Sequence, residues 1–371
     1  METIFDVLVI GAGPGGLAAS RLSSKRGLKT LLIDKKLAIG EPVNCGEGEW
    51  KKDLDDLNVP YSKAICNKIK YTKFVFPQNV LIKIPHPTYF ILNREVFEKE
   101  LARDAINLGC EILVDTLAKD FVFSGNAIEK VKVKIGMINK TEEIKAKFII
   151  LADGRRSLIR KYKEKINLDL SNYESYIVGV QYWMLNLPVE KKCREIYINK
   201  KITNVSYAWV FPKGENEANI GLGISLDKKP FEALNRFIML HRDKKVKDII
   251  RVTKMFIPTS APLPKRQFGN VLLVGDAGRT CDPLTGGGIE RAIFSGLQAA
   301  ETIVEHMEEN KPLEAYDEKL RSLNEKLNAS YRLRKKFLRL TQDQLTKIGL
   351  KWQDAPKNKL KNLTLRELLT K

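Results

Sequence analysis

Hydrophobic and polar positions follow two different periods along the chain, and these periods predict its strands and helices. Unbroken apolar runs at residues 7–10 and 30–33 flank a segment of small residues at 17–25. This pattern predicts two buried strands joined by a helix. Residues 68–92 alternate between apolar and polar positions and predict paired strands. Apolar residues then recur at helical spacing, which predicts a helix over 93–108.

The later part of the chain changes its pattern twice. A short helix is expected at 49–56 and a strand at 111–117, and another buried strand at 147–151. Aromatic residues and alternating strands dominate 167–262, which predicts a sheet-based second domain. A buried strand returns at 270–275. The expected division is a discontinuous nucleotide-binding domain (1–66, 91–165 and 265–310), a β-rich substrate domain (67–90 and 166–264) and a basic helical C-terminal region (311–371).

A glycine-rich turn lies between the first predicted strand and helix. Gly11 allows the tight turn, Gly13 lets the backbone approach a pyrophosphate, and Gly16 lets the helix pack closely on the strand. Gly15 belongs to the same turn, whose helix N-terminus offers free N–H groups to phosphates. Asp34, at the end of the second strand, is placed to accept hydrogen bonds from a ribose diol. The unit therefore predicts a dinucleotide site, although it does not distinguish NAD from FAD.

Charge favours anionic partners. The formal net charge is +19, from 64 basic and 45 acidic residues, although a lysine-rich proteome would also raise it. Residues 311–371 hold 16 Lys/Arg and 7 Asp/Glu, and Leu333, Phe337 and Leu340 share one helical face. This basic amphipathic pattern favours an anionic membrane surface as a partner. No recognised nucleic-acid motif accompanies the charge, so we expect no nucleic-acid partner.

Cysteine and histidine usage argues against a metal site. The five cysteines are widely scattered without a CxxC pair, and the three histidines are isolated, so no metal is expected. Free cysteines suit a reducing cytosol. No apolar run approaches the roughly 18–20 residues needed to cross a bilayer. We therefore expect a cytoplasmic protein that can lie peripherally at the inner face of the cell membrane.

Two later motifs bear on the choice of dinucleotide. Residues 148–157 (FIILADGRRS) and 271–289 (VLLVGDA, continuing to DPLTGGGI) follow the glycine turn in order. With that turn they resemble the flavoprotein hydroxylase-like FAD enzymes, which have a glutathione-reductase-type nucleotide fold. The resemblance implies FAD as the cofactor. It also implies an α/β fold, α+β overall, in which a Rossmann-like FAD domain carries an inserted antiparallel-sheet substrate domain and a helical C-terminal tail.

The resemblance assigns cofactor contacts along the chain. Asp276, after a buried strand, can take a ribityl hydroxyl, and the N–H groups of Gly286, Gly287 and Gly288 can face the flavin's pyrimidine edge. Ile289 would be the first helical residue beside the ring. The remaining implied contacts are Arg94 to the pyrophosphate or ribose, the backbone of Ala118 to the adenine, and Asp153 to the nucleotide and second-domain elements.

Two further segments narrow the resemblance. Residues 42–48 (PVNCGEG) and 207–212 (YAWVFP) look like the geranylgeranyl reductase family. This implies an enzyme that uses FAD to saturate C=C bonds of geranylgeranyl chains in archaeal membrane lipid precursors, with an isoprenoid lipid as substrate. No second GxGxxG is present, so electrons would come from NAD(P)H, ferredoxin or another carrier.

Alkene reduction needs a hydride, from N5 of the reduced flavin, and a proton at the neighbouring carbon. Cys45 is our candidate for proton donation or flavin contact, whereas a buried cysteine without a role is the alternative. Gly46 and Gly48 would let the backbone approach the cofactor. Tyr207, Trp209 and Phe211 would lie on one sheet face and line an apolar tunnel, or form ordinary sheet core.

Two other functions remain open from the residues alone. A flavin-dependent monooxygenase or halogenase could use the same fold, although the stretch from Tyr207 to Pro212 departs from a halogenase WxWxIP segment at its first and fifth positions. A membrane- or nucleic-acid-binding protein with a structural flavin is the third interpretation. Oxygen-dependent turnover of an aromatic substrate would favour the monooxygenase or halogenase.

Overall fold

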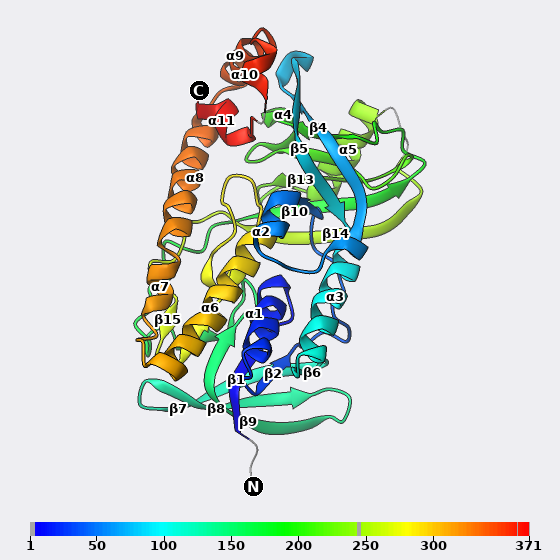
Figure 1. Cartoon of the computed structure of the whole chain (residues 1–371). Coiled ribbons are helices and arrows are strands. Elements are labelled where there is room, and N and C mark those ends of the chain that lie inside the picture. Colours follow the sequence, from blue (N-terminus) through cyan, green and yellow to red (C-terminus); the bar gives the residue numbers. More distant parts are fainter. Residues whose placement is uncertain (1–3, 243–245, 362, 371) are drawn as a thin grey trace.

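The computed structural model describes residues 4–242, 246–361 and 363–370, which form two eight-stranded sheets and a helical C-terminal segment (Figure 1). The first sheet is mainly parallel. Its strands run in the order β15 (Gln267–Phe268), β16 (Val271–Leu273), β9 (Lys140–Leu151), β1 (Ile4–Ile10), β2 (Thr30–Ile33) and β6 (Glu111–Leu113), and a hairpin of β7 (Thr116–Ser124) and β8 (Ala127–Ile135) joins β9.

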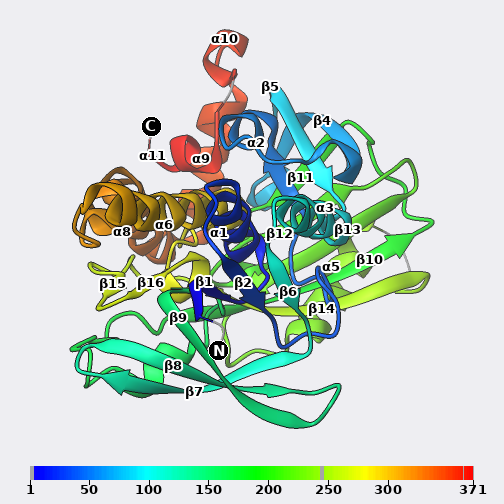
Figure 2. The same ribbon diagram turned by 60° about the horizontal axis from the view of Figure 1, so that its bottom comes forward.

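The first sheet is covered on both faces, which explains why its strands are continuous apolar runs. Along β1, Val7 and Val9 pack on one face with the helices, and Leu8 and Ile10 pack on the other with β7 and β8. Figure 2 shows the helical face as a row over the strands: α6 (Ile289–Glu309), α1 (Pro14–Lys25) and α3 (Arg94–Asn107).

Helices α1 and α6 approach each other closely because glycine occupies the contact. A Cβ at Gly296 of α6 would lie 2.1 Å from the carbonyl oxygen of Gly15 in α1. This approach brings the start of α6 beside the start of α1. Two helix N-termini therefore share the carboxyl edge of the first sheet.

The second sheet is antiparallel except where β11 and β4 run parallel. Its order is β14 (Ile249–Pro258), β10 (Tyr176–Leu185), β13 (Glu217–Ile224), β12 (Ala208–Pro212), β11 (Cys193–Tyr197), β4 (Ile65–Val75), β5 (Leu81–Leu92) and β3 (Gly48–Trp50). Helix α5 (Pro230–Arg242) packs on one face, where Leu234 and Phe237 meet Val180 and Leu222. Residues that alternate with these face the other way.

The C-terminal segment packs against both sheets: its start lies in the core cluster of the first sheet, and its later part lies in a cluster with the second. It comprises α7 (Ala315–Lys319), α8 (Arg321–Arg339), α9 (Gln342–Gln353), α10 (Lys357–Leu360) and α11 (Leu365–Thr370). Leu333 and Phe337 of α8 are buried in one cluster with Ile82 and Ile196, and Leu340 packs against it. The apolar face that the sequence pattern offered to a membrane is therefore covered by protein.

Two predicted elements begin or end differently. The helix expected at 49–56 starts after a short edge strand, so that β3 ends at Trp50 and α2 covers Lys51–Asp56. The strand expected at 111–117 is interrupted at Asp115, whose φ of 48° is left-handed and turns the chain from β6 into β7. The remaining short helices are η1 (Ser62–Ala64), η2 (Pro77–Asn79), η3 (Leu158–Tyr162), α4 (Lys200–Thr203) and η4 (Gly275–Gly278).

The mixed α/β fold expected from the motifs is confirmed, while the domain boundaries stay predictions. No helix within the described residues combines the length and the apolar character that a bilayer crossing requires.

Candidate active site

A cavity of about 960 Å³ lies between the carboxyl edge of the first sheet and the face of the second sheet that α5 leaves uncovered. Its wall contains residues of the glycine turn, the loop around Cys45, strand β12 and the loop before α6. Ligands bind at this edge in open α/β sheets because strand ends and helix N-termini converge there. The cavity is the candidate active site.

The glycine turn forms one end of the cavity. Gly11 has a φ of 108°, and a Cβ at Gly16 would lie 1.9 Å from the carbonyl oxygen of Gly11. These two glycines are therefore required by the packing of the turn itself. A Cβ at Gly13 would meet nothing within 4 Å. Helix α1 starts there without a side-chain cap, so its first N–H groups remain available to a phosphate in the cavity.

Three predicted nucleotide contacts lie outside the cavity wall. Asp34 is buried, and its carboxylate accepts hydrogen bonds from the backbone N–H of Ala12 at 2.6 Å and of Lys36 at 2.8 Å. Asp153 accepts a bond from the N–H of Leu158, and its Oδ1 has no partner among the described residues. Ala118 lies in β7 opposite Val133. Their contacts with a nucleotide stay predictions.

Arg94 begins α3 and lines the cavity. Its guanidinium pairs with Glu98, while its buried Nε has no hydrogen-bond partner among the described residues. Burial alone would lower the pKa of Arg94, but Glu98 and Cys45 raise it above its usual range. A permanent positive charge with an unused donor therefore stands beside the glycine turn, which suits an anionic ligand.

The loop before α6 forms the facing wall. Asp276 lies in η4, where burial raises its pKa although Arg279, Arg155 and Arg94 act in the opposite direction. Helix α6 begins at Ile289, as expected. The N–H of Gly286 donates to the carbonyl of Asp282 at 2.8 Å, and that of Gly287 donates to Oγ1 of Thr285 at 3.3 Å. Two of the three predicted flavin-facing N–H groups are thus used within the loop.

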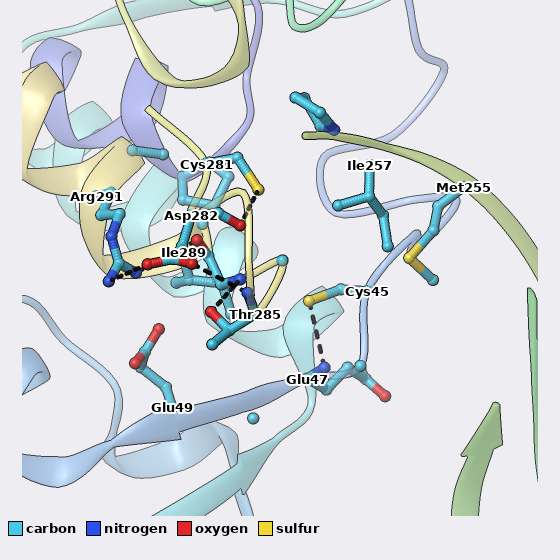
Figure 3. Close-up of a pocket in the computed structure, with 18 of the residues that line it drawn as sticks. Cys45, Glu47, Glu49, Met255, Ile257, Cys281, Asp282, Thr285, Ile289 and Arg291 are labelled. Atoms are coloured by element: carbon cyan, nitrogen blue, oxygen red, sulfur yellow. Dashed lines mark hydrogen bonds and ion pairs between the residues drawn. The ribbon is translucent and has the colours of Figure 1, made fainter. Parts of the chain in front are cut away.

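Cys45 lies across the cavity from this loop, on the side of Met255 and Ile257 (Figure 3). Its sulfur accepts a hydrogen bond from the N–H of Glu47 at 3.2 Å. Its carbonyl accepts one from Nε2 of Gln181 at 3.0 Å.

Gly46 and Gly48, which follow Cys45, pack against aromatic rings. A Cβ at Gly46 would lie 3.2 Å from the ring of Phe211, and one at Gly48 would lie 2.2 Å from the hydroxyl of Tyr89. A side chain at position 48 would therefore displace Tyr89, whereas one at position 46 would press on the ring of Phe211.

The three predicted substrate-lining aromatics all reach the cavity wall, on β12 or just before it. Tyr207 donates its hydroxyl to the carbonyl of Thr285, and Trp209 donates Nε1 to Oε1 of Gln181 at 2.8 Å. Phe211 supports Gly46 as described above. Their alternate positions, on β12 and just before it, place the three side chains in one cluster, as predicted.

Comparison with known proteins identifies the fold and the family. The model of the geranylgeranyl reductase catalytic domain matches residues 175–256. A digeranylgeranylglycerophospholipid reductase of Thermoplasma volcanium is 34% identical, over 100% of this chain and 93% of that protein. The chain belongs to the geranylgeranyl reductase family. It is accordingly an FAD-dependent oxidoreductase of the geranylgeranyl reductase type.

Solved structures agree with this family membership. A geranylgeranyl bacteriochlorophyll reductase-like protein of Thermoplasma acidophilum superposes with a TM-score of 0.91 at 30% identity, over 100% of this chain and 96% of that one. The flavin-dependent brominase Bmp2, as a triple mutant, reaches a TM-score of 0.74 at 16% identity, over 98% of this chain and 97% of that one. The brominase shares the fold, and at this identity nothing more follows.

Behind the cavity wall of this geranylgeranyl reductase family member lies a polar network that the sequence patterns did not predict. Glu47 is fully buried, and its carboxylate accepts hydrogen bonds from Lys213, Asn219 and Arg251. Lys213 follows a buried strand directly, and a lysine there is an unusual position for a solvated charge. That position was the available signal. Gln181, within an apolar run, was the other.

A carboxyl cluster at the far wall was also missed. Glu49 lines the cavity, and burial raises its pKa to about 7, with Asp53 and Glu290 acting in the same direction. The N–H of Trp50 and the charge of Arg291 lower it in part. Figure 3 shows Glu49 and Arg291 on the side of the cavity that also carries Asp282.

The C-terminal segment completes the wall. Ser330 of α8 donates to Oδ2 of Asp282 at 2.8 Å, and residues 364–367 and Thr370 line the cavity. Residues 311–371 were expected to act only as a basic helical region. The structure brings part of this region into the candidate active site.

Proposed function

We propose that this protein binds FAD and saturates C=C bonds of geranylgeranyl chains in archaeal-type membrane lipid precursors. One observation carries the proposal: a single cavity joins a phosphate-binding glycine turn to a wall of aromatic side chains and Cys45. Family membership supports the reaction class, and likeness to the digeranylgeranylglycerophospholipid reductase of Thermoplasma volcanium supports the proposed substrate class.

The residues present suit FAD. Gly13 leaves its face open, the first N–H groups of α1 are uncapped, and Nε of Arg94 is an unused buried donor. These groups would hold the pyrophosphate. Asp276 would take a ribityl hydroxyl, and the start of α6 would meet the flavin ring. FAD, when bound, supplies the hydride for the reaction. We expect NAD(P)H, ferredoxin or another carrier to supply electrons.

The chain itself must orient the alkene, exclude water and deliver a proton. Tyr207, Trp209 and Phe211 provide an apolar wall against which an isoprenoid chain can lie. Cys45, on the opposite side from the loop before α6, is the proposed proton donor. Its S–H bond breaks as the new C–H bond forms, and solvent then returns the proton to sulfur.

The decisive experiment follows the flavin and the lipid together. The purified protein should show a flavin spectrum, and after anaerobic reduction it should be reoxidised by digeranylgeranylglycerophospholipid, with a mass gain of two hydrogens per bond. A colourless protein that cannot be reconstituted with FAD would overturn the proposal. Reoxidation by oxygen and an aromatic compound, with no lipid product, would favour the monooxygenase or halogenase.

We also propose that an anionic bilayer is the surface on which this enzyme meets its substrate. The exposed face of α8 and α9 carries Arg332, Lys335, Lys336, Arg339 and Lys347. Each such charge near an anionic surface contributes about 1 kcal/mol. Because the apolar face of α8 is covered, attraction of charge, rather than insertion of this face, carries the proposed binding.

Charge reversal tests the surface. The triple variant Lys335→Glu, Lys336→Glu and Arg339→Glu should lose most binding to phosphatidylglycerol vesicles, because attraction becomes repulsion. A matched variant reverses the exposed Lys119, Lys132 and Lys134 of the β7–β8 hairpin and should bind normally. Equal loss in both variants would show that net charge, not this face, governs binding.

A further inference from the structure

The carboxylate of Glu47 is the centre of a buried charge cluster behind the cysteine loop. Its Oε2 accepts from Nζ of Lys213 at 2.8 Å, Nδ2 of Asn219 at 2.7 Å and Nη2 of Arg251 at 2.9 Å. Its Oε1 accepts from the backbone N–H of Arg94 at 3.0 Å. The cluster therefore ties the loop to β13, β14, the residue after β12, and the start of α3.

The main chain of Glu47 is fixed as firmly as its side chain. Its carbonyl accepts from the N–H of Leu92 at 2.7 Å, and its φ of 69° is left-handed, which a non-glycine residue adopts only when its surroundings hold it. This conformation directs its N–H to the sulfur of Cys45. The charged side chain and the sulfur contact thus belong to one residue.

The cluster holds buried charges of both signs. Glu47 pairs with Lys213, which is 2% exposed at the side chain, and with Arg251, which is 22% exposed. Burial alone would raise the pKa of Glu47, but Lys213 and Arg251 lower it, so the carboxylate is ionised. Both cations also lie over the ring of Trp183, at 4.8 Å and 5.3 Å, and a second carboxylate, that of Glu217, accepts a hydrogen bond from Nε1 of this ring at 3.4 Å. Loss of either cation would leave the buried carboxylate of Glu47 without one of its partners.

We propose that Lys213 is a positioning residue, which acts through Glu47 and prepares Cys45 to release a proton. In the reaction, the S–H bond breaks and the proton joins one alkene carbon, while the other carbon receives the hydride. The thiolate left behind is stabilised by the N–H of Glu47, which Lys213 holds in place, and by the charge of Arg94. This inference rests on the proposed function, because it gives Cys45 the role of proton donor.

Alkylation of Cys45 by iodoacetamide tests the inference without lipid turnover. The thiolate is the species that reacts. The rate at about pH 7, divided by the plateau rate at about pH 10, therefore reports ionisation separately from accessibility. The full-length protein keeps all its cysteines, and mass spectrometry separates the labelled Cys45 peptide from that of the exposed Cys66.

Lys213→Met should lower this ratio about tenfold, the size expected when one interaction with a charged group is lost. Lys213→Arg, which keeps the cation, should stay within about twofold of the parent. With lipid as substrate, kcat should fall in Lys213→Met and KM should stay the same. Arg251→Met, at a less buried position, should lower the ratio in the same direction if Lys213→Met fails to fold.

Asn270→Ala is the matched control for a purely structural effect. The amide of Asn270 donates to the carbonyls of Ile128 at 2.9 Å and Lys147 at 2.9 Å, both in the first sheet and outside the charge cluster. It should lower the melting temperature and leave the ratio unchanged. An unchanged ratio in Lys213→Met and Arg251→Met would overturn the inference. Failure of lipid reduction by the parent protein would instead reject the proposed function.

Discussion

The two ends of the cavity are built by different means. The glycine turn is made from residues 11–16, a contiguous stretch of backbone at the edge of a parallel sheet. The cysteine loop is held by side chains that come from β10, β13 and β14, and by Lys213 directly after β12. The glycine turn depends on the absence of side chains, since a Cβ at Gly11 or Gly16 would meet backbone atoms. The cysteine loop depends on charges and hydrogen bonds that must all be present.

This difference gives the two ends different weaknesses. A steric requirement responds to volume and is indifferent to pH, whereas a buried network responds to charge and protonation. The glycine turn should therefore fail abruptly when a methyl group is added. The opposite walls should respond to pH and to the loss of single polar atoms.

The largest effect is expected at the glycine turn. Gly16→Ala should prevent folding, because its Cβ would lie 1.9 Å from the backbone oxygen of Gly11 and neither backbone can move away. Gly13→Ala should fold normally, because its Cβ meets nothing within 4 Å, yet should bind FAD at least tenfold more weakly. Circular dichroism and FAD titration separate the two outcomes.

A Gly16→Ala protein that folds and binds FAD would show that the turn accommodates an added methyl group. The glycine turn would then not be limited by steric contact. Tight FAD binding by Gly13→Ala would mean that the pyrophosphate does not approach that face of the turn.

A smaller effect is expected from pH at Glu49. Its pKa is raised to about 7, mainly by burial, so between about pH 4.5 and 7 the folded protein holds a proton that the unfolded chain has lost. Stability should therefore fall as pH rises through this range, by at most about 3 kcal/mol. Melting temperatures at several pH values should show this slope in the native protein and a flatter one in Glu49→Gln.

Glu129→Gln, at an exposed carboxyl on β8, provides the control and should keep the slope of the native protein. A slope of the same size in the Glu49 variant would assign the pH dependence to other groups. The carboxyl cluster around Glu49 would then be less sensitive to protonation than its burial suggests.

The same difference explains how much could be predicted from the sequence. The first strand, turn and helix follow from local patterns, because the hydrophobic period and the glycine spacing both lie within short segments. The start of α6 at Ile289 likewise follows from a short motif. The family and the aromatic wall followed from resemblance to short motifs. Tyr207 directly precedes β12, and Trp209 and Phe211 lie on it, so their common face could also be derived from alternation.

The charge cluster could not be derived in this way. Glu47 and Lys213 are 166 positions apart, and their contact depends on which strands of the second sheet are neighbours. Alternation gives the face of a side chain but not its partner across the sheet. The covered face of α8 was missed for a related reason: Leu333 and Phe337 have the same pattern whether they meet lipid or protein.

The smallest effect is expected where the two walls are joined by one hydrogen bond. Tyr207→Phe removes the hydroxyl that donates to the carbonyl of Thr285, and should cost about 1 kcal/mol of stability. The loop that carries Gly286 would lose a hydrogen bond to the second sheet, so the fluorescence of bound flavin should change.

Tyr182→Phe is the matched control, because the Tyr182 hydroxyl donates to Asn235 at 3.0 Å, away from the cavity wall. If both variants lose similar stability and neither alters flavin fluorescence, the hydrogen bond of Tyr207 supports the fold alone. A change in flavin fluorescence confined to Tyr207→Phe would show that the contact between the two walls lies at the flavin, where the glycine turn and the cysteine loop must act together.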